Sequence, residues 1–137
     1  MSFVYILAAI LIFGVLIAVH ELGHFLAAKL CGVQVNEFSI GMGPAVWHRK
    51  KGETAYSFRV LPIGGYCAME GEDGDTGNAR AFTRQGFWKK FVILAAGAFM
   101  NFLTGLLIVA ILFSSAGTFF VDGITGLAPE VSRTGEN

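Results

Sequence analysis

Charge is absent from two long stretches of this sequence. No charged residue occurs between Phe3 and Val19 or between Phe91 and Val121, and 54% of all residues are hydrophobic. Each stretch is long enough to cross a hydrocarbon core about 30 Å thick. No basic residue precedes the first stretch and no small-residue cleavage site closes it, which argues against a secretory signal peptide. The composition therefore predicts a membrane protein with at least two spanning helices.

Cysteine and net charge are also scarce. The chain has two cysteines, Cys31 and Cys67, and their spacing matches no zinc or redox pair, so we interpret them as small apolar side chains that stay reduced. The formal net charge is zero, and no basic stripe is left over to indicate nucleic-acid binding. The lipid bilayer is the partner that the composition predicts, and nothing in it indicates an oligomeric state.

The basic residues that are present gather in or beside the segment between the two apolar stretches. They are nine of the ten lysines and arginines: Lys29, Arg49, Lys50, Lys51, Arg59, Arg80, Arg84, Lys89 and Lys90. Lysine and arginine favour the cytoplasmic side of a membrane. We therefore predict a multi-pass protein whose residues 32–86 are cytoplasmic and whose termini both lie outside the cytoplasm.

The hydrophobic pattern predicts strands between two membrane helices. The first helix runs from Phe3 to Leu30, where Cys31 and Gly32 form a glycine stop. Apolar and polar residues alternate over residues 56–60, which is typical of a half-buried strand. The fold class is therefore membrane α-helical with a small β-region. We expect a membrane helix over residues 1–31, a membrane-associated cytoplasmic β-region over 32–86, a second membrane helix over 87–116 and an extracytoplasmic tail over 117–137.

The first helix contains the residues that carry chemistry. His20, Glu21 and His24 form the pattern H-E-x-x-H. Positions i and i+4 share one helix face, so both imidazoles can bind one divalent ion while the glutamate acts on a water. Zinc accepts such ligands and lowers the pKa of its water to about 7. Because an idle charged group at the bilayer centre costs on the order of 3 kcal/mol, we favour a metal site over an unused cluster.

Depth in the membrane connects the two helices. At 1.5 Å per residue, His20 lies roughly 15 Å inside Leu30, and Asn101 lies roughly 15 Å beyond Phe91 from the same side. Asn101 is thus level with the H-E-x-x-H motif. It is a candidate to hold a substrate carbonyl or oxyanion, and a plain helix-to-helix hydrogen bond is an equal alternative.

A third metal ligand is missing from the pattern. Catalytic zinc usually has three protein ligands. Asp122 lies roughly 45 Å from the cytoplasmic end of the second helix, on the wrong side of the membrane. His48 and the acidic residues 70–75 lie in the loop, outside the expected depth. We expect the third ligand to come from outside this chain.

Four motifs in order resemble the site-2 protease family of intramembrane zinc metalloproteases, and most closely its bacterial branch, which cleaves anti-sigma factors and signal-peptide remnants. They are the histidine motif, "FSIGMGPAVW" (Phe38–Trp47), "LPIGGYCAMEGE" (Leu61–Glu72) and "AGAFMNF" (Ala96–Phe102). The resemblance covers nearly the whole chain. It implies a bacterial cytoplasmic-membrane enzyme that hydrolyses peptide bonds in single-span membrane proteins.

The resemblance also implies roles for individual residues. His20 and His24 correspond to zinc ligands, Glu21 to the catalytic acid and base, and Gly97 with Asn101 to a motif facing the active site. Residues 61–69, with Gly64, Gly65 and Tyr66, are similar to a β-loop that binds an unwound substrate by presenting a strand edge.

The chain departs from the family pattern in three ways. It has Ala98 where the bacterial branch usually has proline, and it lacks both the later Leu-Asp-Gly motif with the third ligand and the PDZ modules. We therefore expect an N-terminal fragment that is inactive alone. The alternative is a metal-binding membrane module without hydrolysis, for which the two histidines suffice.

Overall fold

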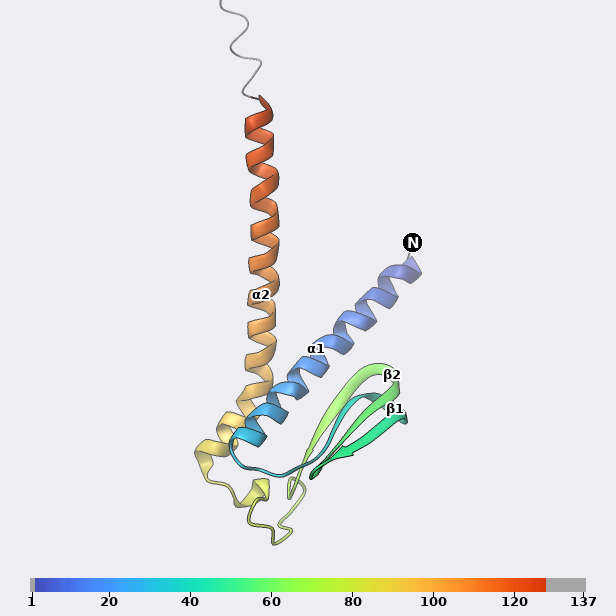
Figure 1. Cartoon of the computed structure of the whole chain (residues 1–137), viewed down its shortest axis with the longest axis vertical. Coiled ribbons are helices and arrows are strands. Elements are labelled where there is room, and N and C mark those ends of the chain that lie inside the picture. The colour runs from blue at the N-terminus through green and yellow to red at the C-terminus, as the bar shows by residue number, and fades with distance from the viewer. Residues whose placement is uncertain (1, 128–137) are drawn as a thin grey trace, which may run out of the picture. The chain divides into compact units, whose positions relative to one another are not determined.

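The structure is a computed structural model that describes the backbone of residues 2–127 and the side chains of residues 3–114. Helix α1 (Ser2–Leu30) is followed by strands β1 (Val35–Lys51) and β2 (Thr54–Met69), a 3-10 turn (Phe82–Arg84) and helix α2 (Phe87–Leu127) (Figure 1). The two long apolar helices flank a two-stranded antiparallel sheet, which confirms the predicted fold class. The chain divides after Asn101 into two compact units.

Helix α1 ends as the glycine stop predicts. Gly32 has a φ of 80°, a conformation that glycine adopts without steric cost. The Gly32 amide donates to the Lys29 carbonyl at 3.2 Å, and the Val33 amide donates to the Ala28 carbonyl at 2.9 Å. This pair of bonds defines a Schellman cap. Val33, the residue after the glycine, is fully buried, so the cap also anchors the start of the β-region in the core.

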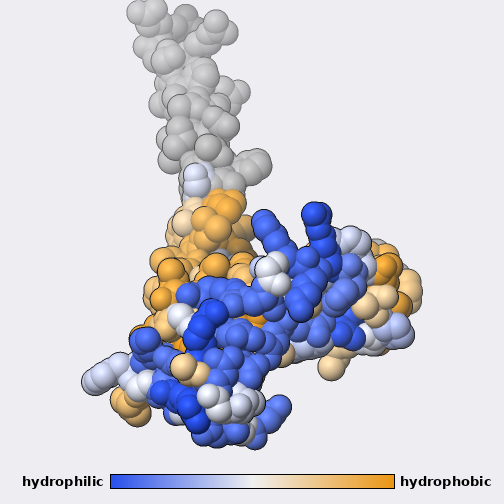
Figure 2. Space-filling view, turned by 60° about the horizontal axis from the view of Figure 1, so that its bottom comes forward, coloured by the Kyte–Doolittle hydropathy of each residue, from blue (hydrophilic) through white to orange (hydrophobic). Residues whose placement is uncertain are grey.

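The two helices present apolar side chains to their surroundings. Phe3–Leu30 and Phe87–Ser114 are each long and apolar enough to span a membrane, and 6% and 11% of the residues in their most apolar windows are buried within the protein. A helix that is apolar on all sides and so little covered by protein suits a lipid environment. Figure 2 shows that the face turned forward from the bottom of Figure 1 is largely hydrophilic. The chain is a membrane protein.

The β-region is a bent hairpin. Lys51 pairs with Thr54 across a two-residue turn, in which Gly52 has a φ of 64°, as a type II′ turn requires at its first central position. Residues 37–40 of β1 pair twice, with residues 55–58 on one side and residues 65–68 on the other. The hairpin therefore folds back on itself, and its segment 65–69 is brought next to helix α1, which has extensive contacts with β2.

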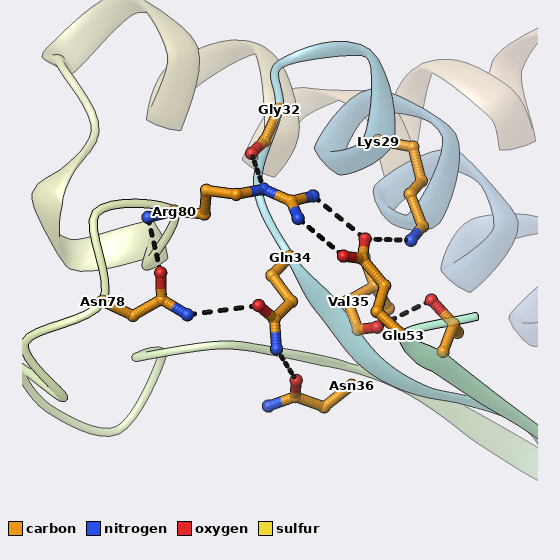
Figure 3. Close-up of polar contacts among 9 residues, drawn as sticks. Lys29, Gly32, Gln34, Val35, Asn36, Glu53, Asn78 and Arg80 are labelled. Atoms are coloured by element: carbon orange, nitrogen blue, oxygen red, sulfur yellow. Dashed lines mark hydrogen bonds and ion pairs between the residues drawn. The ribbon is translucent and has the colours of Figure 1, made fainter. Parts of the chain in front are cut away.

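Polar contacts join the hairpin turn to the end of α1 (Figure 3). Glu53 accepts hydrogen bonds from Lys29 at 2.6 Å and from both terminal nitrogens of Arg80 at 2.6 and 2.9 Å. The Arg80 Nε donates to the carbonyl of Gly32 at 3.1 Å. The hydrogen bonds from Arg80 and Lys29 lower the pKa of Glu53 to about 2. One carboxylate thus ties the hairpin, the end of α1 and the segment before α2 together.

Helix α2 begins at Phe87, as the sequence predicts, and continues beyond residue 116 to Leu127. Part of the segment expected as an extracytoplasmic tail is therefore helical. The remainder of that tail, residues 128–137, lies outside the described residues. Inside the first unit, Ile93 of α2 is fully buried and belongs to the core with Ala28, Val33 and Val35. This core holds the first turns of α2 against the end of α1.

Candidate metal centre

His20 and His24 lie one turn apart on α1 and face the same point. Their Nε2 atoms are 3.1 Å apart, and the ring centroids are 4.7 Å apart at an interplanar angle of 82°. The i, i+4 spacing puts both side chains on one face, as the motif predicts. The convergence of two ring nitrogens is the central feature of the site.

A backbone carbonyl of α2 orients His24. The Nδ1 of His24 lies 2.8 Å from the carbonyl oxygen of Ile93, which can only accept a hydrogen bond. The ring proton therefore sits on Nδ1, and Nε2 keeps its lone pair for another partner. Metal-binding histidines almost always donate their second nitrogen in this way, which fixes the tautomer and the ring orientation.

Gly97 of α2 packs directly against the histidine pair. A Cβ atom at this position would lie 2.5 Å from His24 Nε2 and 2.7 Å from His20 Nε2, so no larger residue fits without moving a ring. Gly23 on α1 is equally tight, because its Cβ would clash with the backbone carbonyl of Ala96. The absence of two side chains thus allows the helices to approach at the level of the site.

Asn101 reaches His20 from the next turn of α2. Its Nδ2 lies 3.5 Å from His20 Nδ1, while its Oδ1 is buried and has no hydrogen-bond partner among the described residues. Turning the amide over brings Oδ1 toward His20 Nδ1, which then donates its proton and leaves Nε2 free. Asn101 therefore lies level with the H-E-x-x-H motif, as the sequence predicts. Both interpretations of it, a substrate-facing amide and a helix-to-helix contact, remain compatible with this position.

The donor set fits a divalent metal in part. Two nitrogens that bind one tetrahedral zinc at about 2.0–2.1 Å lie about 3.3–3.4 Å apart, close to the observed separation. Neutral imidazole with its other nitrogen held by a carbonyl is a suitable zinc ligand. No group of three or more histidine, cysteine, aspartate or glutamate side chains comes together within the described part of the chain. His20 and His24 could hold the ion, and a complete site needs a further ligand.

Glu21 faces the hairpin. A Cβ on Gly65 would lie 3.7 Å from the Glu21 side chain, which places segment 65–69 of β2 beside the motif. No side-chain hydrogen bond or ion pair holds the Glu21 carboxylate among the residues that the structure describes. The carboxylate, the histidine pair and a strand of β2 are therefore close to one another.

Gly64 and Tyr66, which are also predicted to bind substrate, make contacts within the hairpin itself. Gly64 has a φ of 82° and packs against the side chain of Met42, so it forms a bend in β2. The Tyr66 hydroxyl accepts a hydrogen bond from Arg59 at 2.6 Å. Successive strand residues face opposite sides, so Tyr66 and Gly65 point in opposite directions. Of Gly64, Gly65 and Tyr66, only Gly65 is brought next to the histidine motif.

Arg59 is a residue of this region that the sequence analysis did not single out. Besides Tyr66, it donates to Ser39 at 2.8 Å, to the Gly43 carbonyl at 2.8 Å and to Glu37 at 3.1 Å. Burial raises the pKa of Glu37, but hydrogen bonds led by that of Ser57 outweigh it and lower the pKa overall. The sequence could have indicated Arg59, because an arginine is unusual in the apolar half of a strand. Nothing in the sequence could have indicated Ile93, which contributes only its backbone carbonyl to the site.

Taken together, the geometry defines a candidate divalent-metal site of a membrane protein. The sequence from residue 8 to residue 135 matches the family model described as peptidase family M50. The chain belongs to this family, and the resemblance to the site-2 proteases is confirmed.

Several bacterial proteins named "Putative zinc metalloprotease" are similar to this chain. The one from Clostridium perfringens is 45% identical over 125 residues, covering 91% of this chain and 37% of the relative. That from Clostridium acetobutylicum is 49% identical over 117 residues, with 85% and 33% covered. That from Fusobacterium nucleatum is 42% identical over 116 residues, with 85% and 34% covered. The chain spans about a third of the length of these relatives.

Proposed function

We propose that this chain supplies part of the active site of a zinc metalloprotease that hydrolyses peptide bonds within the membrane. The observation that carries the proposal is the 3.1 Å approach of two imidazole nitrogens inside a membrane helix, with a carboxylate in the next position of the chain. Membership of peptidase family M50 and the names of the relatives support the reaction class.

Each side chain has a role in this proposal. His20 and His24 hold the ion, with the Ile93 carbonyl and Gly97 fixing their rings. Bound zinc supplies a Lewis acid and lowers the pKa of water to about 7. Glu21 accepts a proton from the attacking water and delivers it to the leaving amine. Asn101 directs its amide to the substrate carbonyl or to the oxyanion that develops from it.

The substrate in this proposal is an extended segment of a single-span membrane protein, such as an anti-sigma factor or a signal-peptide remnant. A peptide bond inside a helix is shielded, so the segment must unwind before attack. The edge of β2 at Gly64–Tyr66 can hold it by main-chain hydrogen bonds, as in strand addition. The position of Gly65 beside Glu21 supports this arrangement.

The proposed topology follows from the basic residues and is part of the same proposal. Residues 32–86 lie on the cytoplasmic side of a bacterial cytoplasmic membrane, and both ends of the chain lie outside. The metal then sits within the membrane and nearer the cytoplasm. The ligand missing from the described residues is supplied by a further part of the protein, so this chain alone has little or no activity.

A metal-binding membrane module without hydrolysis is the second candidate. It is favoured by the observation that only two ligands meet in the described residues. Such a module does not need a carboxylate at position 21. Replacing Glu21 therefore distinguishes the protease from the metal-binding module.

The test uses a chimera in which this chain replaces the matching third of the Clostridium perfringens relative. Cleavage of a single-span membrane peptide and zinc content are measured together. We expect Glu21→Gln to retain zinc and to lose cleavage at least about a hundredfold, the usual contribution of a general acid and base. Glu72→Gln is the control, since Glu72 lies in the loop. Cleavage that survives Glu21→Gln would rule out the protease proposal and leave the binding module.

A further inference from the structure

Six of the nine basic residues between Lys29 and Lys90 have acceptors within the protein. Lys29 and Arg80 contact Glu53, Arg59 contacts Glu37, and Arg84 contacts Asp75, while Lys89 and Lys90 donate to the carbonyls of Cys31 and Thr83. The other three are adjacent in the sequence. Arg49, Lys50 and Lys51 are exposed, and their side chains form no ion pair or hydrogen bond with any described residue.

These three residues border one pocket. It has a volume of about 460 Å³ and is lined by Trp47, Arg49, Lys50, Lys51 and Tyr56. Arg49 pairs with Tyr56 and Trp47 pairs with Phe58 across the hairpin, and the Trp47 and Phe58 rings are 5.8 Å apart. Successive strand residues face opposite sides, so the Arg49 and Lys51 side chains share a face with Trp47, and Lys50 lies between them at the edge of the pocket. No carboxylate is among the residues that line it.

The contacts of the hairpin with α1 show the level at which this pocket lies. Glu53, in the turn next to Lys51, contacts Lys29 in the last turn of α1. At the other end of the hairpin, Pro62 packs against Gly14, about 23 Å further along α1 at about 1.5 Å per residue. The strands therefore run beside the membrane helix, from its end toward its middle.

The composition of the hairpin agrees with this placement. The residues around the inner end are exposed and apolar: Met42, Val46, Val60, Leu61 and Ile63. Trp47 lies about 13 Å inward from Lys51 at about 3.3 Å per strand residue. Lysine and arginine at the helix end, aromatic rings next and aliphatic side chains deeper reproduce the order of phosphate, interface and hydrocarbon in a bilayer. The three free cations therefore lie at the level of the lipid phosphates.

We propose that the pocket of Trp47, Arg49, Lys50, Lys51 and Tyr56 binds the headgroup of an anionic phospholipid. The guanidinium fork of Arg49 and the ammonium group of Lys51 can form charge-assisted hydrogen bonds with phosphate oxygens, and Lys50 adds a further positive charge nearby. Anionic lipids of the cytoplasmic leaflet are attracted by such basic clusters at the membrane surface. The bound lipid would hold the hairpin, and with it the strand beside Glu21, at a constant depth. This proposal does not depend on the protease function.

The test follows Trp47 emission in the detergent-solubilised full chain carrying Trp88→Phe, so that one tryptophan remains. The probes are short-chain phosphatidylglycerol, short-chain phosphatidylcholine and inorganic phosphate. We expect a saturable change with phosphatidylglycerol only. Arg49→Gln with Lys50→Gln and Lys51→Gln should weaken that binding roughly tenfold or more, since each basic residue contributes to attraction of anionic lipid.

Two further variants, each with three substitutions, serve as controls. Arg49→Lys with Lys50→Arg and Lys51→Arg keeps all three charges and should keep binding. Arg84→Gln with Lys89→Gln and Lys90→Gln removes three charges that have protein acceptors, and should leave binding unchanged. Equal responses to both lipids, an equal response to inorganic phosphate, no response to any probe, or equal loss in the two neutralised variants would each overturn the proposal.

Discussion

At the scale of single residues, the site depends as much on missing side chains as on present ones. Gly97 leaves the space that the two imidazole rings occupy, and Gly23 lets the α2 backbone come close enough for the Ile93 carbonyl to reach His24. Neither glycine has a positive φ, so conformational freedom is not their role. Their role is steric, because a single methyl group at either position would occupy space that the neighbouring atoms already fill.

Gly97→Ala tests this steric role. The added Cβ would meet ring atoms of both histidines at 2.5–2.7 Å, so the rings must turn away from their common point. We expect zinc affinity to fall roughly a hundredfold, the upper range for changes that disturb ligand orientation. Alanine favours helix over glycine by about 1 kcal/mol, so the helix itself should not be lost. Zinc titration and circular dichroism of the purified chain measure the two effects separately.

Gly86→Ala is the matched control, because a Cβ at Gly86 meets no atom within 4 Å. It should change neither zinc affinity nor helix content. If Gly97→Ala bound zinc as tightly as the parent chain, the packing of α2 against the histidine pair described above would be wrong.

At the scale of elements, a single carboxylate holds the hairpin against the end of α1. Glu53 accepts hydrogen bonds from Lys29 and Arg80, and Arg80 also reaches the Schellman cap at Gly32. The pKa of Glu53 falls from an ordinary 4.5 to about 2 as a result of these partners. A group with a lowered pKa stabilises the folded state above its unfolded pKa and loses this contribution as it is protonated.

The pH dependence of unfolding tests this link. The stabilisation from Glu53 should be fully present above about pH 4.5 and should be lost between about pH 4.5 and pH 2. In Glu53→Gln this part of the acid dependence should disappear. The measurement is the midpoint of thermal unfolding in detergent from pH 7 to pH 2, with Asp73→Asn as a control of equal charge. Identical acid profiles for the parent chain and Glu53→Gln would contradict the link.

Much of this element arrangement was predictable from local sequence signals. The glycine stop at Gly32 and the level of Asn101 follow from rules that act over a few residues or one helical rise, and the structure agrees with both. The double pairing of residues 37–40 was not predictable, because both partner segments have suitable strand patterns. The Ile93 carbonyl was not predictable either, since any residue type offers the same backbone oxygen.

At the scale of the whole molecule, the proposed enzyme takes two metal ligands, a carboxylate and a strand edge from this chain. The chain spans about a third of the length of its relatives. The extension of α2 to Leu127 was missed because the residues after 116 include polar and glycine residues that usually end a helix. In the proposed enzyme, the third ligand comes from the remaining length. The pair of histidines should still recognise the metal without it, with lower affinity.

A zinc titration of the purified 137-residue chain, monitored with a competing indicator, tests whether His20 and His24 form a metal site when a variant with His20→Ala and His24→Ala is titrated beside it. We expect weak binding of one zinc ion per chain, abolished in the double variant. Equal binding by the two proteins, or no binding by the parent chain at saturating zinc, would contradict the claim that His20 and His24 form a metal site.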